Sequence, residues 1–225
     1  MQADTNAIFE KYSTESYTRR TALTAGSSLT NAQAAIIMLH GRGASAADIL
    51  GLAAEIGRPG LAYFAPQAPN SSWYPNRFLA PLASNQPWLD AALEQVRQVV
   101  AVIAKGRLPN SRVFLLGFSQ GASLALEYAA RSGHTWGGVF GLSGALIGPP
   151  GSARAYPPGL AGTPVLLGCS DVDPYIPRPS VVESAKILSD LGAQVDTRIY
   201  PGLGHTIHPD EIEAIQAVLD QALGH

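Results

Sequence analysis

The chain has 225 residues, and 46% of them are hydrophobic, which is enough to bury a sizeable core and excludes a wholly disordered protein. Its 15 Lys and Arg residues against 17 Asp and Glu residues give a net charge of -2, without the basic excess that nucleic-acid binding requires. The single cysteine can form no internal disulfide, so the composition is compatible with a reducing compartment.

The first twenty or so positions are polar where a secretory signal would carry an apolar stretch. No apolar run in the sequence is long enough to span a membrane. We therefore expect a cytoplasmic protein without stable membrane insertion.

The next part of the chain alternates apolar runs of strand length with a segment of helical periodicity. Residues 36–39, 61–65 and 113–116 are short apolar runs that predict buried strands. Between the second and third runs, apolar residues recur at helical spacing over 88–103, which predicts an amphipathic helix. This alternation indicates an α/β fold with a mostly parallel central sheet flanked by helices.

The second half of the chain continues the same alternation. Pro209, followed by Asp210 and Glu211, predicts the start of the last helix, because proline suits the first helical position and acidic side chains suit the positive end of the helix dipole. The other expected elements are a helix over 119–131, strands over 139–142 and 165–167, a helix over 181–191 and a strand over 195–200.

Two stretches interrupt this pattern, at 66–81 and 148–164. Strand and helix signals resume after each without a change of composition, so we interpret both as long loops. The sequence therefore predicts a single domain over residues 1–225.

The strongest chemical signal is the G-x-S-x-G sequence centred on Ser119. It lies directly between the apolar run VFLL and the helical ASLALEYAA, which is the strand, tight turn and helix of a nucleophile elbow. Small neighbours allow the turn to take strained backbone angles and leave the hydroxyl exposed at the end of the sheet. A plain glycine-rich turn is the alternative.

A serine nucleophile needs a histidine base and an acid, normally in the chain order Ser, Asp or Glu, His for this architecture. His205 is favoured as the base because it follows the last predicted strand in a glycine-rich loop. His208 is better interpreted as a capping or surface residue. A metal shared by these two histidines is the weaker alternative, since no convincing third ligand lies nearby.

For the acid, Asp171 and Asp173 both follow the strand at 165–167, and the residues alone do not separate them. Either could instead be a turn aspartate that binds its own backbone. Asp196 and Glu183 are weaker candidates because they lie within a strand and a helix.

At this point the chain resembles the phospholipase/carboxylesterase family of α/β-hydrolases, which includes the acyl-protein thioesterases. The likeness runs from about residue 35 to the end of the chain. It is carried by four segments in family order: LHGRG at 39–43, GFSQG at 117–121, DPYIP at 173–177 and YPGLGH at 200–205.

The resemblance implies a role for each matching position. It implies Ser119 as nucleophile and His205 as base, and the family pattern Asp-Pro-x-Val-Pro falls on 173–177, which favours Asp173 over Asp171 as the acid. The backbone N–H groups of Arg42 and Gln120 occupy the places of the oxyanion hole.

Two residues near the first strand need a separate interpretation. Family members often carry an aliphatic residue where this chain has Arg42, so its guanidinium either points into water or, less favoured, attracts an anionic part of the substrate. His40 is expected to orient its loop by hydrogen bonding and not to act as a second base.

Trp73 and Tyr74 stand in a loop that could fold over the cleft, with Phe78 and Leu79 close behind. They would form an apolar acyl or alcohol pocket. The alternative, that they only anchor the loop, is equally compatible with the residues.

Together these features predict a serine carboxylesterase that hydrolyses small or medium acyl esters through a covalent acyl-enzyme. We expect a small-molecule ester as substrate, no cofactor or metal, and no nucleic-acid partner, and we leave a homodimer open. A thioesterase or lysophospholipase is the nearest alternative, and a non-catalytic binding protein of the same fold is the alternative from another class.

Overall fold

The computed structural model describes residues 22–224 of the chain. The polar start on which the expectation about a secretory signal depends lies outside the described residues. Within the described part, no helix is both long and apolar enough to cross a bilayer.

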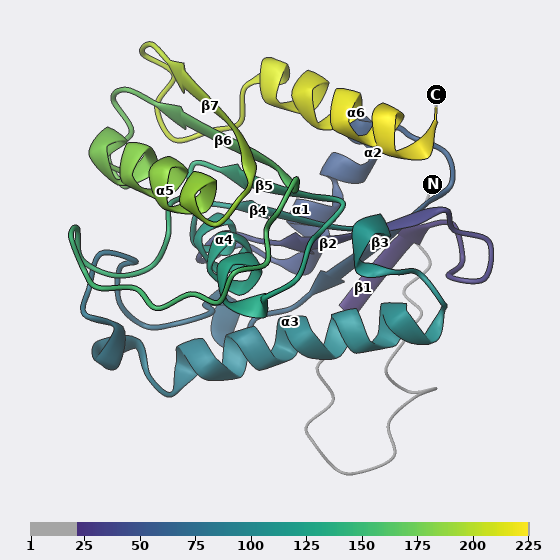
Figure 1. The fold of residues 1–225 in the computed structure, drawn as a ribbon, viewed down its shortest axis with the longest axis horizontal. Coiled ribbons are helices and arrows are strands. Elements are labelled where there is room, and N and C mark those ends of the chain that lie inside the picture. Colours follow the sequence, from purple (N-terminus) through teal and green to yellow (C-terminus); the bar gives the residue numbers. More distant parts are fainter. Residues whose placement is uncertain (1–21, 225) are drawn as a thin grey trace.

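The centre of the molecule is a sheet of seven strands in the order β1-β3-β2-β4-β5-β6-β7 (Figure 1). Strand β1 pairs antiparallel with β3, and every other pair is parallel, so the predicted α/β class with a mostly parallel sheet is confirmed. The strands are β1 (Ala22–Gly26), β2 (Ala34–Leu39), β3 (Leu61–Pro66), β4 (Val113–Phe118), β5 (Gly138–Leu142), β6 (Pro164–Ser170) and β7 (Gln194–Tyr200).

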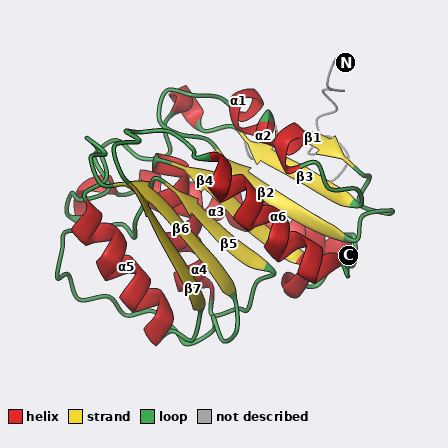
Figure 2. Cartoon of the chain, turned by 90° about the horizontal axis from the view of Figure 1, so that it is seen from above, coloured by secondary structure: helices red, strands yellow, loops and turns green. Residues whose placement is uncertain are grey.

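Helices cover both faces of this sheet. Helices α3 (Trp88–Lys105), α4 (Gln120–Ser132) and α5 (Arg178–Asp190) lie on one face. Helices α1 (Ala46–Leu50), α2 (Leu52–Ile56) and α6 (Pro209–Leu223) lie on the other. Figure 2 shows α6 crossing one face of the sheet with α3 and α4 behind it.

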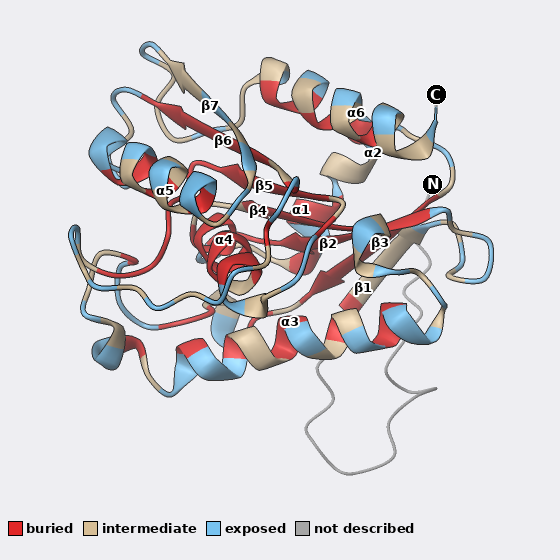
Figure 3. Ribbon diagram, viewed as in Figure 1, coloured by how far each residue is buried: buried red, intermediate tan, exposed pale blue. Residues whose placement is uncertain are grey.

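Successive residues of a strand pack into opposite halves of the core, one on each face of the sheet. Ile37 packs with the layer that contains α3, α4 and α5, whereas its neighbour Ile36 packs with α1, α2 and α6. Strands β2 and β3 are buried over their whole length, as expected for parallel strands covered on both faces, while β7 is largely exposed or half-buried (Figure 3).

The predicted elements are found with boundaries that differ by one to a few residues, and the segment 66–81 has only a short 3-10 turn at Pro69–Ser71. Strand β1 and the short helices α1 and α2 were not predicted. Strand β1 is only ALTAG, without the run of branched or aromatic residues that indicates a strand, and it forms through pairing with β3 at the sheet edge.

The register of the parallel strands brings their carboxyl ends level with one another. Leu39 of β2 pairs with Gly117 of β4, and Ser170 of β6 pairs with Tyr200 of β7. The loops that follow β2, β4, β6 and β7 therefore emerge along the same edge of the sheet.

Candidate active site

Ser119 occupies the sharp turn between β4 and α4, with φ 55° and ψ -117°. These angles lie in a region that non-glycine residues rarely adopt, and such strain is concentrated at functional sites. The Ser119 N–H donates to the carbonyl of Leu142 at 2.9 Å, and the Ser119 carbonyl accepts from the N–H of Ser123 at 3.1 Å. Backbone bonds on both sides therefore hold the strained turn in place.

The two glycines that flank Ser119 are required by close backbone approach. A Cβ atom on Gly117 would lie 2.2 Å from the carbonyl oxygen of Gly121, and a Cβ atom on Gly121 would lie 2.0 Å from the carbonyl oxygen of Leu39. Both distances are far inside van der Waals contact. The absence of side chains therefore lets the end of β2 and the start of α4 meet at the elbow.

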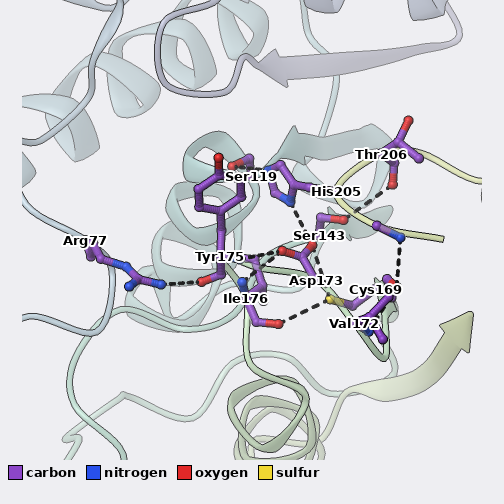
Figure 4. A network of polar contacts seen from close by, with 12 residues as sticks. Arg77, Ser119, Ser143, Cys169, Val172, Asp173, Tyr175, Ile176, His205 and Thr206 are labelled. Carbon is purple, nitrogen blue, oxygen red and sulfur yellow. Dashed lines mark hydrogen bonds and ion pairs between the residues drawn. The ribbon is translucent and has the colours of Figure 1, made fainter. Parts of the chain in front are cut away.

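The His205 imidazole links the serine to a carboxylate. Its Nε2 atom lies 2.9 Å from Ser119 Oγ, and its Nδ1 atom lies 2.7 Å from Asp173 Oδ2 (Figure 4). His208, by contrast, caps α6, where its Nδ1 atom accepts from the Asp210 N–H at 3.1 Å. With both nitrogens of His205 engaged in this way, the two histidines are not arranged to share a metal ion.

The Asp173 side chain is fully buried behind His205. Its Oδ1 atom accepts from the N–H groups of Tyr175 at 2.8 Å and Ile176 at 3.0 Å, which aims Oδ2 at the imidazole. The thiol of Cys169 lies 3.8 Å from Oδ2, and burial raises the pKa of this thiol to about 12. It therefore stays protonated and serves as a weak donor to the carboxylate.

Asp171 lies in the same loop but serves a different purpose. Its Oδ1 atom accepts from the Gly202 N–H at 2.8 Å, while Ser170 Oγ accepts from the Gly204 N–H at 3.0 Å. The loop after β6 thus holds the loop that carries His205. Asp196 is ion-paired with Arg198 on β7, away from these contacts.

The backbone N–H groups of Arg42 and Gln120 come from the loop after β2 and from the first residue of α4, and both residues line the same cavity as Ser119. The first N–H groups of a helix have no partner within it, so the Gln120 N–H is available to a ligand. His40 is buried, and its Nδ1 atom lies 2.8 Å from the Gly41 carbonyl while Nε2 accepts from the Ala68 N–H at 3.1 Å. It orients the loop by hydrogen bonding, as predicted.

The guanidinium of Arg42 corrects the sequence interpretation, which favoured a group directed into water. It donates from Nη1 to Pro75 O at 2.8 Å and Ser72 Oγ at 3.1 Å, and from Nη2 to Asn76 O at 2.7 Å and Tyr74 O at 3.0 Å. These acceptors belong to the segment between β3 and α3, residues 67–87, which we call the β3–α3 loop. Arg42 therefore clamps this loop.

The Gln120 side chain holds the same loop from the opposite element. Its Nε2 atom donates to the Tyr74 carbonyl at 2.7 Å, and its Oε1 atom accepts from the Trp73 N–H at 3.0 Å. Arg42 and Gln120, which both line the cavity, thus use their side chains to position the β3–α3 loop.

A cavity of about 440 Å³ opens beside Ser119. Tyr74 and Phe78 contribute to its wall. Trp73 does not; its side chain is buried, and its Nε1 atom donates to the His40 carbonyl at 2.8 Å. The wall consists of Gly41, Arg42, Ala44, Tyr74, Arg77, Phe78, Phe118, Ser119, Gln120, Ser123, Tyr175, Ile176 and His205.

The sequence interpretation missed two residues at the mouth of the cavity, Tyr175 and Arg77. The ring of Tyr175 stands edge-on to His205 at 4.9 Å, and Arg77 Nη2 donates to the Tyr175 carbonyl at 2.9 Å (Figure 4). Tyr175 belongs to the DPYIP segment, so its proximity to Asp173 was visible, but Arg77 carried no local signal.

Comparisons with known proteins agree on one family. A family model described as phospholipase/carboxylesterase matches residues 25–223. The solved structure of a phospholipase/carboxylesterase from Dyadobacter fermentans DSM 18053 superposes with a TM-score of 0.84 at 41% identity, covering 89% of this chain and 96% of that one.

Curated relatives carry two kinds of name. Acyl-protein thioesterase 1 from Gibberella zeae is 34% identical over 123 residues, which cover 54% of this chain and 52% of the relative. Carboxylesterase SOBER1 from Arabidopsis thaliana is 29% identical over 137 residues, covering 59% and 60%. In the Gibberella zeae protein and in a second acyl-protein thioesterase 1, from Saccharomyces cerevisiae, the match to this chain covers about half of the relative's length.

Proposed function

Since the chain belongs to the phospholipase/carboxylesterase family of α/β-hydrolases, we propose that it is a serine carboxylesterase that works through a covalent acyl-enzyme. The observation that carries this proposal is the hydrogen-bonded series from Ser119 Oγ through the His205 imidazole to Asp173 Oδ2, at 2.9 Å and 2.7 Å. Such a series is what a serine hydroxyl needs to become a nucleophile at neutral pH.

In the first half of the reaction, Ser119 Oγ attacks the carbonyl carbon of the ester while His205 Nε2 accepts the hydroxyl proton. The buried Asp173 carboxylate stabilises the imidazolium that forms. The carbonyl electron pair moves onto oxygen, where the N–H groups of Arg42 and Gln120 stabilise the negative charge. When the tetrahedral intermediate collapses, the bond to the alcohol oxygen breaks, and this oxygen takes the proton from His205.

The second half repeats the sequence with water. His205 Nε2 accepts a proton from the water molecule as its oxygen attacks the acyl carbon, and the second tetrahedral intermediate releases the carboxylic acid. The proton returns from His205 to Ser119 Oγ. No cofactor enters this scheme.

The size and lining of the cavity support small or medium acyl esters. A volume of about 440 Å³ lies in the range of small-molecule sites, and Tyr74, Phe78 and Phe118 give it an apolar wall. Because a relative is named acyl-protein thioesterase, and because the same residues can attack a thioester, thioester hydrolysis is the second candidate.

The decisive test replaces the nucleophile. Ser119→Ala should lower kcat for para-nitrophenyl butyrate by roughly a thousandfold or more, since the attacking oxygen is gone while the remaining groups stay in place. A fluorophosphonate probe should label the wild-type protein at Ser119 and leave the variant unlabelled.

The matched control is Ser189→Ala, which removes another hydroxyl from an exposed position of α5. This variant should keep full activity and full labelling, and thermal unfolding should confirm that both variants are folded. Undiminished hydrolysis by a folded Ser119→Ala protein would refute the proposal. A paired series of oxygen and sulfur esters of equal chain length then separates carboxylesterase from thioesterase activity.

A further inference from the structure

In the part of the chain that the structure describes, the wall of the cavity carries positive charge without any compensating carboxylate. Among its residues, the groups able to bear a positive charge are Arg42, Arg77 and His205, and neither an aspartate nor a glutamate is present. Asp173 is fully buried behind His205 and already bonded to it. Clefts lined by charge of one sign concentrate ligands of the opposite sign.

Within residues 22–224, neither Arg42 nor Arg77 forms an ion pair. Among the described residues, the arginines that form ion pairs with carboxylates are Arg58, Arg97, Arg131, Arg154 and Arg198. Arg42 and Arg77 instead donate to uncharged oxygens, which leaves the full positive charge of each at the cavity.

The two arginines differ in how far the protein uses their donors. Both terminal nitrogens of Arg42 are occupied by the β3–α3 loop, so this residue works as a clamp. Arg77 is exposed, and its guanidinium donates to the described residues only from Nη2, to the Tyr175 carbonyl. A guanidinium offers donors from every nitrogen in a planar fork, so Arg77 keeps donors for a ligand.

Hydrogen bonds to the Arg77 carbonyl fix the position of its backbone. The Arg77 carbonyl accepts from Asn85 Nδ2 at 3.3 Å and from the Ala80 N–H at 3.0 Å, and Asn85 is fully buried. Asn85 Oδ1 also accepts from the Asn76 N–H at 2.9 Å. The loop is thus folded around a buried amide directly beneath Arg77, while the bond to Tyr175 draws the guanidinium to the cavity mouth.

From these observations we propose that Arg77 is a specificity-determining residue that recognises a carboxylate on the ester substrate. The proposal rests on the function proposed above and names its substrate class: esters that carry a negatively charged carboxylate on the acyl or the alcohol part. The free donors of Arg77 bind this carboxylate at the cavity mouth while the ester carbonyl lies at Ser119. A fork of N–H donors matches the two oxygens of a carboxylate.

The test compares esters of equal shape and different charge, with one pair for each side of the scissile bond. On the acyl side, para-nitrophenyl hydrogen adipate is compared with para-nitrophenyl adipamate, in which a primary amide replaces the carboxylate. On the alcohol side, the butyrate ester of meta-hydroxybenzoate is compared with that of meta-hydroxybenzamide. We expect kcat/KM to favour the anionic ester by about tenfold or more in one pair, with the gain mainly in KM.

Arg77→Gln should abolish this preference, so that within each pair the ratio of kcat/KM for the anionic ester to kcat/KM for the neutral ester falls to about one. The matched control is Arg178→Gln, which removes the same charge from an exposed residue that does not line the cavity. It should keep the preference. Rising salt should weaken the preference in the wild-type protein.

Two results would overturn the proposal. One is hydrolysis of the neutral esters without preference for either anionic partner. The other is a preference that survives in Arg77→Gln. Both differ from failure of the proposed function itself, in which none of the esters, charged or neutral, would be hydrolysed.

Discussion

The two walls of the active site are held by different means. On the side of the strand ends, Ser119 lies in a turn where backbone atoms of β2, β4 and α4 approach so closely that glycine is required at 117 and 121. On the other side, hydrogen bonds from the long polar side chains of Arg42 and Gln120 hold the β3–α3 loop, in addition to the packing of its buried aromatic residues. The first wall, which we call the closely packed wall, has no room for a side chain at positions 117 and 121. The second, which we call the loop wall, depends on hydrogen bonds that one substitution can remove.

This difference means that the groups proposed for the reaction and the groups that select the substrate lie on different walls. The groups that we propose form and break bonds sit on the closely packed wall, where packing leaves them little freedom. The groups that shape the cavity and meet the rest of the substrate, such as Tyr74 and Phe78, sit on the loop. A scaffold of this kind can change its substrate through the loop while its chemistry stays constant.

The largest effect is expected from filling the closely packed wall. Gly121→Ala would place a methyl group 2.0 Å from the carbonyl oxygen of Leu39, which neither backbone can avoid without moving. We expect a loss of about 3 kcal/mol in the free energy of unfolding and a loss of activity, at the upper end of the usual cost of overpacking, because the opposing atom belongs to the backbone. Urea unfolding and ester hydrolysis measure the two losses.

Gly162→Ala is the control for this variant. Gly162 has φ +73°, and an added Cβ there would meet nothing within 4 Å. Its cost is limited to the backbone strain of a left-handed alanine, about 1 kcal/mol, without effect on activity. If Gly121→Ala lowered the free energy of unfolding by no more than Gly162→Ala does, the closely packed wall would have room to adjust, which would contradict the comparison drawn above.

An intermediate effect is expected from releasing the loop. Arg42→Ala removes four donor contacts to the β3–α3 loop and leaves Ser119, His205 and Asp173 unchanged. We expect kcat/KM for a neutral ester to fall by about 10- to 100-fold, because small displacements of a site wall have effects of that size.

Arg42→Lys should recover little of this activity, because an ammonium group cannot span acceptors that the planar guanidinium joins. Limited proteolysis should cut the β3–α3 loop faster in both variants than in the wild-type protein. Wild-type kcat/KM in Arg42→Ala would show that the loop holds its position without the clamp.

The smallest effect is expected from the pH dependence of stability that a single buried carboxyl group, that of Glu211, contributes. Glu211, at the start of α6, is buried against Gly168 of β6, and its Oε2 atom accepts from the His208 N–H at 2.6 Å. Burial raises the pKa of this carboxyl to about 7. Because the folded state holds the proton more tightly than the unfolded state, this contribution to stability is present at low pH and is lost as pH rises from about 4.5 through 7.

Glu211→Gln keeps an acceptor for His208 and removes the titration. The fall in Tm between pH 5 and pH 8 should be smaller in this variant than in the wild-type protein, by the equivalent of about 1 to 2 kcal/mol. Glu213→Gln, an exposed neighbour on the same helix, is the control and should leave the wild-type slope unchanged. Equal slopes in all three proteins would exclude Glu211 as the source.

The closely packed wall is also the part of the site that the sequence predicts best. Glycines at 117 and 121 around Ser119, between an apolar run and a helical pattern, form a motif that is local in the chain, even though the atom that excludes a side chain at Gly121 belongs to Leu39. Asp171 and Asp173 could not be separated from the residues alone, because both follow β6 in one turn. Their different positions follow from the N–H groups that they accept from. Asp173 accepts from Tyr175 and Ile176, whereas Asp171 accepts from Gly202.

The loop wall was harder to predict because its contacts join residues far apart in the chain. Arg42 reaches acceptors thirty or more positions away, and Arg77 reaches Tyr175 across 98 positions. No spacing or periodicity records such pairs. The expectation for Trp73 and Tyr74 was left between pocket and anchor for the same reason, and the structure divides the two roles between the two residues.

The thiol of Cys169 gives the closely packed wall one further property. It is the only sulfhydryl in the chain, it is buried, and it lies against the carboxylate that orients His205. Alkylating reagents attack a thiolate that they can reach, so they act here only during transient opening of the sheet edge around β6. The rate of alkylation should therefore report how often the structure around the Asp173 carboxylate opens to solvent.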